Sequence, residues 1–454
     1  MLTSTSSAGS VCSRAAISLT LGLILVGTVS APAQAESVRS KQWHLDAMQA
    51  EEMWKASTGE GVTVAVIDSG VDSNNGDLKG QVLKGLNLEK DIPGNESDDY
   101  DGHGTGMAGL IAGTGKSFGG DGAFGLAPGA KILPIRMPKS TDAANQAASD
   151  SEFDSAAPQA IRYAIDQGAR VINVSMGSKR ESQSLTGAVK YALEKGALVF
   201  AAVGNSADSG NSVEYPAGTP GVVGVGAIGE DLKRTNESQF GPQVDLAAPG
   251  SELVYACTAK SGLCRGHGTS GATALASASA ALIWSKHPDW TNNQVLRVML
   301  NTAGGPVSGD ERTDAIGYGI VRPRIALKTP GDPGPADEYP LPDLAAAESA
   351  KPSAEPSPAK GGSEANETPA AAAPATDDEG GNAALWVGLG VGAAALVGGA
   401  VAVAVVRSRR RSAATSAVPP YQQSQLTYPG YGPPSGAPEG QPPYGGPPAQ
   451  GPRS

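Results

Sequence analysis

The chain has 454 residues and a formal net charge of −11 at pH 7, part of which comes from acidic residues between positions 337 and 379. No basic stripe lies in the part that should fold, which excludes nucleic acid as an expected partner. The composition shifts sharply near both ends, so the residues do not form one globule.

Residues 1–35 have the pattern of a secretory signal peptide. Arg14 supplies a positive charge, residues 15–29 form an apolar run, and Ala-Gln-Ala at positions 33–35 is a cleavage pattern before Glu36. An uncleaved anchor helix is the alternative, but the apolar run is short for a membrane span. We therefore expect cleavage and export of the remaining chain.

Residues 36–328 should form one folded domain with a short N-terminal extension. Short apolar runs with strand character alternate with helical patterns that end at glycines. The strand-like runs are residues 62–67, 131–136, 170–174, 197–203 and 222–228, and the helical patterns cover residues 159–167 and 185–195. This alternation predicts an α/β fold with a mostly parallel sheet covered by helices on both faces.

Two glycine-framed phrases in the first half of this domain contain an acid and a base. Asp68 directly follows residues 62–67, so it should lie at the carboxyl end of a strand, where the working groups of open α/β sheets gather. His103 lies in Asp-Gly-His-Gly-Thr-Gly and should open a helix, whose N-terminus disfavours a protonated ring. Taken singly, Asp68 is also a typical turn residue and His103 a typical loop residue.

Two further strand ends offer groups that a peptide substrate needs. The strand ending at Val203 is followed by Gly204 and Asn205, and the Asn205 amide is a candidate oxyanion donor, although turn asparagines are common. After the strand near Val174, the backbone could pair with an extended peptide as an added strand. The residues of this candidate substrate-binding segment are Ser175, Met176 and Gly177.

Ser270 lies in Gly-His-Gly-Thr-Ser-Gly, before a run of small residues at positions 272–282. This places its hydroxyl at a helix N-terminus, where free backbone N–H groups stabilise negative charge. An ordinary helix-capping serine is the alternative. Asp, His and Ser together are the groups needed for acyl transfer by an activated hydroxyl. His267, two residues before Thr269, is a competing base, but no phrase frames it as His103 is framed.

Cysteine use points to one disulfide and no metal site. Cys12 lies within the signal peptide, so Cys257 and Cys264 are the pair left in an exported protein. A zinc site would need more ligands nearby than His267. We therefore predict a local Cys257–Cys264 disulfide and neither metal nor cofactor.

The C-terminal part is predicted to be a tether. Residues 329–382 are rich in Pro, Ala and acid and should form a linker. Residues 383–406 carry no charge and are long enough for one transmembrane helix. Arginines follow at once, which places residues 407–454, a tail expected to be disordered, in the cytoplasm. This is single-pass type I topology, with the folded domain outside the cell membrane.

The phrases around Asp68, His103, Asn205 and Ser270 together resemble those of the subtilases, the subtilisin-type serine peptidases, over residues 40–325. The signal peptide, single span and basic tail resemble a narrower group, the mycosins, membrane-anchored subtilases of actinobacterial type VII secretion systems. The resemblance implies a subtilisin-like three-layer α/β fold plus one C-terminal transmembrane helix. It also implies that the segment opening at Gln42 packs on the catalytic domain.

The sequence departs from the usual pattern at two places. Subtilases carry Met-Ala-x-Pro after the serine, whereas Gly271 begins the phrase Gly-Ala-Thr-Ala here, which should change packing without removing a chemical group. About 25 residues separate Glu36 from the first strand, too few to fold alone, so the chaperone pro-domain of secreted subtilisins is not expected.

These observations predict a membrane-anchored extracytoplasmic serine endopeptidase that acts on protein or peptide substrates and is associated with type VII secretion. The alternative is mainly a structural subunit that stabilises a secretion membrane complex, although a scaffold has no need of the four chemical groups. A lipase or esterase would carry Gly-x-Ser-x-Gly, and residues 268–272 lack its last glycine.

Overall fold

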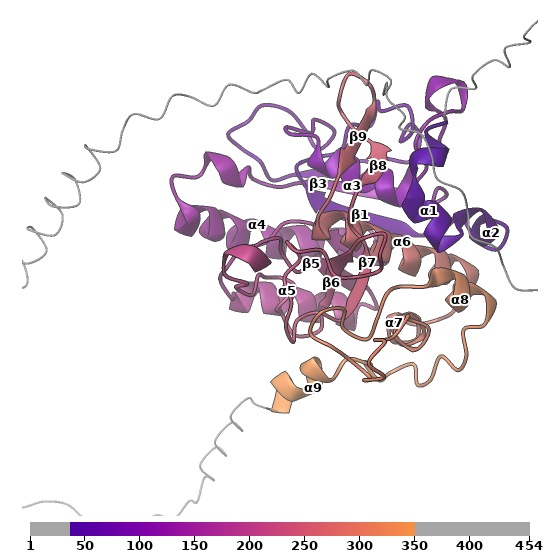
Figure 1. Ribbon diagram of the computed structural model, residues 1–454. Coiled ribbons are helices and arrows are strands. Elements are labelled where there is room, and N and C mark those ends of the chain that lie inside the picture. Colours follow the sequence, from indigo (N-terminus) through magenta and orange to yellow (C-terminus); the bar gives the residue numbers. More distant parts are fainter. Residues whose placement is uncertain (1–36, 350–454) are drawn as a thin grey trace, which may run out of the picture. The chain divides into compact units, whose positions relative to one another are not determined.

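A computed structural model describes residues 37–349, so the predicted signal peptide, membrane span and tail lie outside the described residues. Figure 1 shows the arrangement of its helices and strands. The strands are β1 (Thr63–Asp68), β2 (Leu86–Asn87), β3 (Lys131–Arg136), β4 (Val171–Val174), β5 (Leu198–Ala202), β6 (Val223–Ile228), β7 (Leu246–Pro249), β8 (Leu253–Ala256) and β9 (Leu263–Gly266). The α-helices are α1 (Trp43–Met48), α2 (Ala50–Trp54), α3 (His103–Ala112), α4 (Gln146–Asp166), α5 (Gln183–Glu194), α6 (Thr269–Lys286), α7 (Asn292–Asn301), α8 (Pro323–Lys328) and α9 (Pro342–Ser349).

The predicted parallel sheet is confirmed, and it is larger than expected. Seven strands pair in the order β2-β3-β1-β4-β5-β6-β7, all in parallel, with β1 at the inside of the sheet. Val64 of β1 is in register with Val171 of β4 and with Ile132 of β3. Because all seven strands run the same way, their carboxyl ends share one edge, and β1 delivers Asp68 to that edge.

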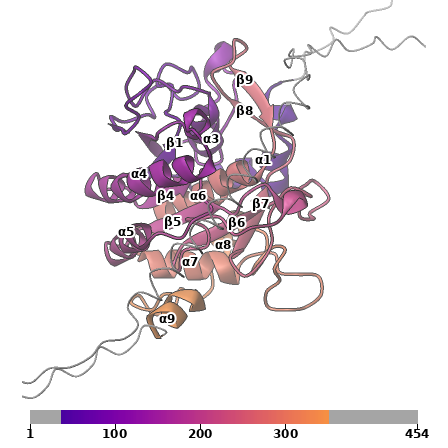
Figure 2. The ribbon, with the colours of Figure 1, turned by 90° about the vertical axis from the view of Figure 1, so that its left-hand side faces the viewer.

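The sheet separates two apolar cores. Along β1, Val64 and Val66 face one core, whereas Ala65 and Ile67 face the other. Such alternation follows from the two-residue period of a strand and makes both faces apolar. Helices α4 and α5 lie side by side over one face (Figure 2) and contribute their buried residues to one core, while α3, α6, α7 and α8 contribute to the other.

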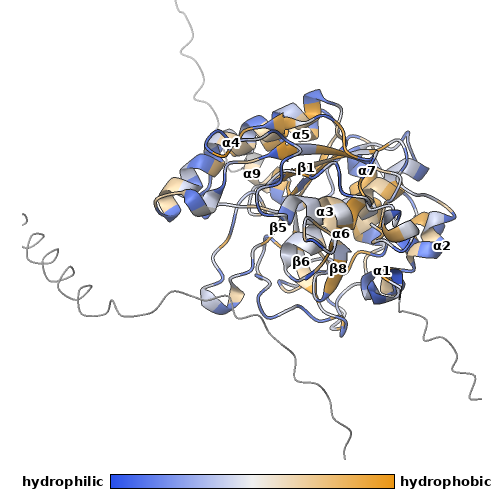
Figure 3. Ribbon diagram, turned by 90° about the horizontal axis from the view of Figure 1, so that it is seen from above, coloured by the Kyte–Doolittle hydropathy of each residue, from blue (hydrophilic) through white to orange (hydrophobic). Residues whose placement is uncertain are grey.

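Helix α6 is deeply buried, because most of its residues are small and apolar on every side. Nearly all of its first sixteen residues are buried, and it packs against α3 and against strands β4 to β7. A helix with an apolar surface on every side belongs in a core. By contrast, α4 alternates hydrophilic and hydrophobic residues along its length (Figure 3) and buries one face alone.

The segment opening at Gln42 packs on the domain, as the resemblance implied. The buried Gln42 side chain donates to the carbonyls of Phe124 and Val254 and accepts from the N–H of Phe124. Trp43 donates its indole N–H to the carbonyl of Ser251, 2.9 Å away. These contacts fix α1 beside the hairpin formed by β8 and β9.

The predicted linker begins too early, because residues 329–349 pack on the domain. Arg297 of α7 donates to the carbonyls of Pro333, Pro335 and Glu338, and Leu341 is only 1% exposed. The low apolar content of this stretch suggested that it could not fold by itself. Instead, the Arg297 side chain holds this stretch by donating to its backbone carbonyls. Composition does not reveal such a contact. We call residues 329–349 the C-terminal strap.

No helix within residues 37–349 combines the length and apolar character needed to cross a membrane. The predicted span at residues 383–406 falls outside that range.

Candidate active site

The carboxyl edge of the sheet brings the predicted acid and base together. Asp68 is the last residue of β1 and its side chain is 1% exposed, while His103 is the first residue of α3. His103 Nδ1 lies 2.8 Å from Asp68 Oδ1. Gly104 makes this approach possible, because a Cβ there would lie 2.1 Å from the carbonyl oxygen of Gly70 and 3.0 Å from Asp68 Cβ.

The carboxylate sets the proton affinity of the ring. The charge of Asp68 raises the pKa of His103 to about 9, against the lowering effect of burial, and a hydrogen bond to the same carboxylate adds to the rise. Helix position alone predicted the opposite direction. The full charge of Asp68 at hydrogen-bond distance outweighs the partial charge of a helix terminus.

Asp99 is a supporting residue that the sequence analysis missed. Its two carboxylate oxygens accept from the N–H of Gly102 and Thr105, and also from the hydroxyls of Ser69 and Thr105, at 2.6–2.8 Å. Ser69 in turn accepts from the N–H of Gly104. Asp99 thereby ties the first turn of α3 to the end of β1. The acidic run before Gly-His-Gly was the available signal, because carboxylates favour helix N-termini.

The predicted nucleophile is the second residue of α6, two positions after the N-cap residue Gly268. The Ser270 hydroxyl donates to the carbonyl oxygen of Ser175 at 3.4 Å, and no hydrogen bond joins it to His103 in the described part of the chain. A hydroxyl changes acceptor by rotation between staggered positions about Cα–Cβ. The backbone N–H of Ser270 belongs to the first helical turn, so it has no partner within the helix.

The unusual Gly271 follows from close packing beside the nucleophile. A Cβ at this position would lie 2.5 Å from Leu253 Cδ1 and 3.3 Å from Leu110 Cδ1. These leucines, from β8 and α3, occupy the space that a methionine side chain would need. Helix α6 continues past Ala274, the position of the missing proline, without interruption.

Asn205 contacts the residue immediately before Ser270. Its Oδ1 accepts from the N–H of Thr269 at 2.8 Å and from the Thr269 hydroxyl at 3.1 Å. Because both partners are donors, the oxygen must face Thr269 and the NH₂ group must face away. The amide nitrogen is therefore free to donate to a group at the surface, where Asn205 is exposed.

The candidate substrate-binding segment follows β4, as predicted. Gly177 is exposed, and the backbone of Met176 and Gly177 makes no hydrogen bond to another described residue. The Ser175 hydroxyl donates to the carbonyl oxygen of Ser270 at 3.2 Å. Reciprocal bonds between Ser175 and Ser270 hold this segment against the start of α6.

Asn173, which the sequence analysis did not single out as a site residue, supports this junction from within the sheet. It is fully buried, accepts from the Ser277 hydroxyl at 3.1 Å and donates to the Ser175 hydroxyl at 3.0 Å. The side chains of Ser277, Asn173 and Ser175 thus link the middle of α6 to the end of β4. An asparagine in an otherwise apolar strand was the signal, because a buried polar group needs partners.

The remaining sequence predictions concern residues near β9. The Cys257–Cys264 disulfide is present and closes the hairpin of β8 and β9. His267 is 69% exposed and its Nδ1 lies 3.4 Å from Glu237, so the competing base is paired with an acid outside the predicted triad. Within residues 37–349, no group of three or more His, Cys, Asp or Glu side chains is arranged to hold a metal ion.

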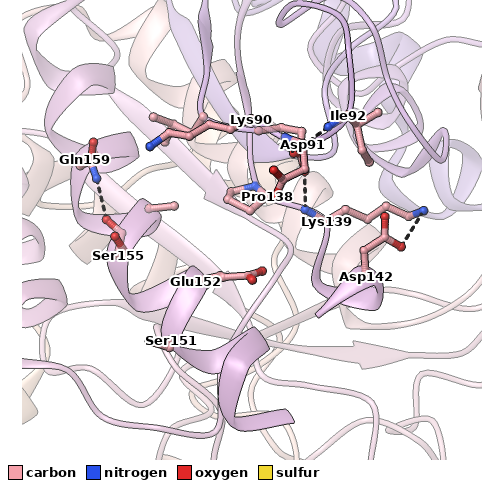
Figure 4. A pocket seen from close by; sticks show the side chains of 13 residues that line it. Lys90, Asp91, Ile92, Pro138, Lys139, Asp142, Ser151, Glu152, Ser155 and Gln159 are labelled. Atoms are coloured by element: carbon pink, nitrogen blue, oxygen red, sulfur yellow. Dashed lines mark hydrogen bonds and ion pairs between the residues drawn. The ribbon is translucent and has the colours of Figure 1, made fainter. Parts of the chain in front are cut away.

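A separate hollow of about 400 Å³ lies beyond β2 and β3, against α4 (Figure 4). Its lining mixes both charge signs, including the Lys139–Asp142 ion pair at 3.2 Å, and Glu89 accepts from the backbone N–H of Lys139. None of the predicted site residues lines it. The predicted site residues lie instead at the carboxyl ends of β1, β4 and β5 and at the start of α6.

Comparisons with known proteins agree with this geometry. Residues 59–323 match the family model described as "Subtilase family". M-protease of Shouchella clausii is 34% identical over 294 residues, which cover 64% of this chain and 70% of that protein. Subtilisin Savinase of Lederbergia lenta is also 34% identical, over 64% of this chain and all of that protein.

Solved structures give the same result at the level of the fold. A crystal structure of MycP1 from Mycobacterium smegmatis is 28% identical, with a TM-score of 0.57, over 68% of this chain and 89% of that one. A structure of the MycP3 protease, from the type VII (ESX-3) secretion system, is 32% identical, with a TM-score of 0.57, over 65% of this chain and 90% of that one.

Proposed function

The chain belongs to the subtilase family of serine peptidases, and on that premise we propose that Asp68, His103 and Ser270 are its catalytic triad. The 2.8 Å hydrogen bond between Asp68 Oδ1 and His103 Nδ1 carries the proposal. It occupies Nδ1 with a proton, so that Nε2 is the nitrogen left to act as a base.

In the proposed reaction, His103 Nε2 takes the proton of the Ser270 hydroxyl as the oxygen attacks a peptide carbonyl carbon. The imidazolium that forms is stabilised by the buried Asp68 carboxylate. It then gives the proton to the leaving amine, and the Ser270 ester remains. Water, deprotonated by the same nitrogen, hydrolyses this ester and restores the hydroxyl. No group outside the described residues is needed for these steps.

Two N–H donors near Thr269 would hold the oxyanion. One is the backbone N–H of Ser270, at the free end of α6, and the other is the amide NH₂ of Asn205, which its contacts with Thr269 aim outward. Removing one such donor typically costs about 10²–10³ in kcat. The segment of Ser175, Met176 and Gly177, in which the backbone of Met176 and Gly177 is open, would pair with the extended substrate.

Labelling with a fluorophosphonate tests the nucleophile. We expect one adduct on Ser270, located by mass spectrometry, and its loss in Ser270→Ala and His103→Ala. Ser69→Ala is a poor control because Ser69 supports α3, so the exposed Ser209→Ala, which should label normally, is the matched variant. A folded chain that carries no label on Ser270 would contradict the triad.

We further propose that the domain is held outside the cell membrane by residues 383–406 and acts within a type VII secretion system. The uncharged run and the arginines after it support the membrane part, and the likeness to the MycP proteases supports the secretion part. Cell fractionation should place the full chain with membranes and a chain ending at residue 382 in the medium. Recovery of both forms in the medium would contradict the anchor.

A mainly structural role in the secretion complex is the second candidate. The similar protein MycP1 is a serine protease and "an essential component of the type VII (ESX-1) secretion system", which supports a role beyond cleavage. If Ser270→Ala preserves secretion while deletion of the whole chain abolishes it, the structural role is the essential one.

A further inference from the structure

Glu214 is an acid beside the proposed active site that the proposed mechanism does not use. It lies on the loop between β5 and β6 and is half-buried. Its Oε1 accepts from Gln239 Nε2 at 2.8 Å and from the Ser206 hydroxyl at 3.5 Å. Gln239 is itself fully buried and also donates to Ser206, so one oxygen of the carboxylate is fixed in place.

The second oxygen, Oε2, is differently placed. It has no hydrogen-bond or ion-pair partner among residues 37–349, yet it does not belong to the polar atoms that are buried without a partner. It therefore reaches solvent. Partial burial raises the pKa of Glu214, and the bonds from Gln239 and Ser206 and the charge of Lys179 oppose the rise.

Two glycines show where this carboxylate sits. A Cβ on Gly204 would lie 2.7 Å from Glu214 Cδ, and a Cβ on Gly177 would lie 3.6 Å from Glu214 Oε2. Gly204 immediately precedes Asn205, the proposed oxyanion donor. Gly177 ends the candidate substrate-binding segment, whose Ser175 contacts Ser270. The carboxylate thus lies between the two backbone segments that flank the attacked carbonyl.

In the proposed mechanism, Asn205 and residues 175–177 hold the attacked carbonyl, so the side chain of the residue that carries it, called P1, would lie next to those two segments. No cation among residues 37–349 forms an ion pair with Glu214, although the charge of Lys179 acts on it from farther away. Arg180 is paired with Asp154 at 2.7 Å, and the exposed Lys179 makes no ion pair with Glu214. A long side chain with a terminal positive charge can reach a recessed carboxylate while its stem covers apolar surface.

We propose that Glu214 is a specificity-determining residue that selects lysine or arginine at P1, through an ion pair between the substrate cation and Glu214 Oε2. This inference rests on the proposed function, because it names the substrate class of that site. Gln239 acts as a positioning residue that turns Oε2 toward the substrate.

The first test uses purified full-length chain in detergent and peptide p-nitroanilides that differ at P1 alone. We expect kcat/KM for P1 Lys and Arg to exceed that for P1 Leu and Phe. Glu214→Gln retains an oxygen for Gln239 and Ser206, and it should lower kcat/KM for the cationic substrates by about 10- to 100-fold. Hydrolysis of the P1 Leu substrate should change little, which reports that the variant is folded.

Two further variants sharpen the result. Glu214→Lys should turn the preference toward P1 Asp or Glu. Glu230→Gln makes the same charge change on an exposed turn after β6, so it should leave the P1 preference intact. A wild-type preference for Leu or Phe over Lys, or a Lys preference that survives Glu214→Gln, would overturn the proposal.

A binding measurement separates this inference from the catalytic proposal. In the Ser270→Ala chain, a peptide with P1 Lys should bind at least about 10-fold more tightly than its P1 norleucine counterpart, measured by fluorescence anisotropy. The difference should vanish when Glu214→Gln is added. Equal affinity of the two peptides in the Ser270→Ala chain would refute the role of Glu214 even if Ser270 is confirmed as the nucleophile.

Discussion

At the scale of single residues, the contact between Asp68 and His103 decides how activity depends on pH. The carboxylate raises the pKa of His103 to about 9, and in the proposed mechanism only the neutral ring accepts a proton from Ser270. We therefore expect kcat/KM to rise with pH, with an inflection near 9 and a plateau above it. Asp68→Asn should move this inflection down toward 6.5 and lower kcat by about 10⁴-fold. An inflection near 6.5 in the unaltered chain would show that the carboxylate does not act on the ring.

A second residue-scale prediction concerns Gly271. Gly271→Ala places a Cβ 2.5 Å from Leu253 Cδ1, so the free energy of unfolding should fall by about 1–3 kcal/mol. Urea denaturation of both single variants and of the double variant with Leu253→Ala measures the coupling between the two positions. The double variant should lose less free energy of unfolding than the sum of the losses in the two single variants. Strict additivity would mean that Leu253 is not the obstacle.

The candidate site residues differ in how well their positions could be predicted from the sequence. The positions of Asp68, His103, Asn205 and Ser270 at strand ends and helix starts could be predicted, because each residue stands in a glycine-framed phrase. Asp99 and Glu214 could not be placed in the same way, because their roles depend on partners brought close by folding. Glu214 meets Gly177, 37 positions earlier, through a loop whose path no local pattern encodes.

At the scale of elements, α1 carries an unusual buried base. His44 is fully buried and neither ring nitrogen has a hydrogen-bond partner among the described residues. Burial, helped by the charge of Arg39, lowers the pKa of His44 to about 3. The unfolded chain binds this proton below about 6.5, whereas the folded chain does not.

The sign of the linkage then gives a prediction for stability. Above pH 6.5 the titration of His44 does not change the free energy of unfolding. As the pH falls from 6.5 toward 3, it lowers the free energy of unfolding by about 1.4 kcal/mol per pH unit. We expect His44→Leu to flatten this part of the pH–stability curve, measured by urea unfolding between pH 4 and 7. Equal curves for His44→Leu and the unaltered chain would contradict this account.

The C-terminal strap is the other element with a direct test. A chain that ends at Lys328 loses the buried Leu341, worth about 1.5–3 kcal/mol, and the partly buried Tyr339. Its free energy of unfolding should therefore be lower by about 3 kcal/mol or more than that of a chain ending at Ser349, by urea denaturation. Arg297→Met, which removes the donors to three strap carbonyls, should reproduce part of the loss. Equal free energies of unfolding of the two truncated chains would mean that the strap does not stabilise the domain.

Elements were predictable where local pattern decided them. β3 matches the sequence analysis because its apolar run is bounded by polar residues. The start of α3 matches because a glycine-framed phrase precedes an apolar helical run. The strap and the two-residue β2 were missed, because each is held by distant partners. Tyr339, for example, donates its hydroxyl to the carbonyl of Gly221 at the start of β6.

At the scale of the whole molecule, two apolar cores on either side of one sheet hold the described domain together. Within residues 37–349 no cluster of ligands suited to a metal ion adds to them. We expect a chelator such as EDTA to leave both the Tm and the rate of peptide hydrolysis unchanged. A fall in Tm of several degrees, reversed by calcium, would reveal an ion that contributes to folding.

The parallel sheet also gives the molecule a front and a back. Its carboxyl edge carries Asp68 and the segments around Ser270. The strap is fastened at the opposite edge, where Asp343 accepts from the N–H of Gly221 at 2.9 Å, just before β6 begins. The polypeptide thus leaves the described domain on the side opposite the proposed active site. A partner protein that binds this opposite side would leave the proposed active site open, so partner binding and peptide cleavage would not compete for one surface.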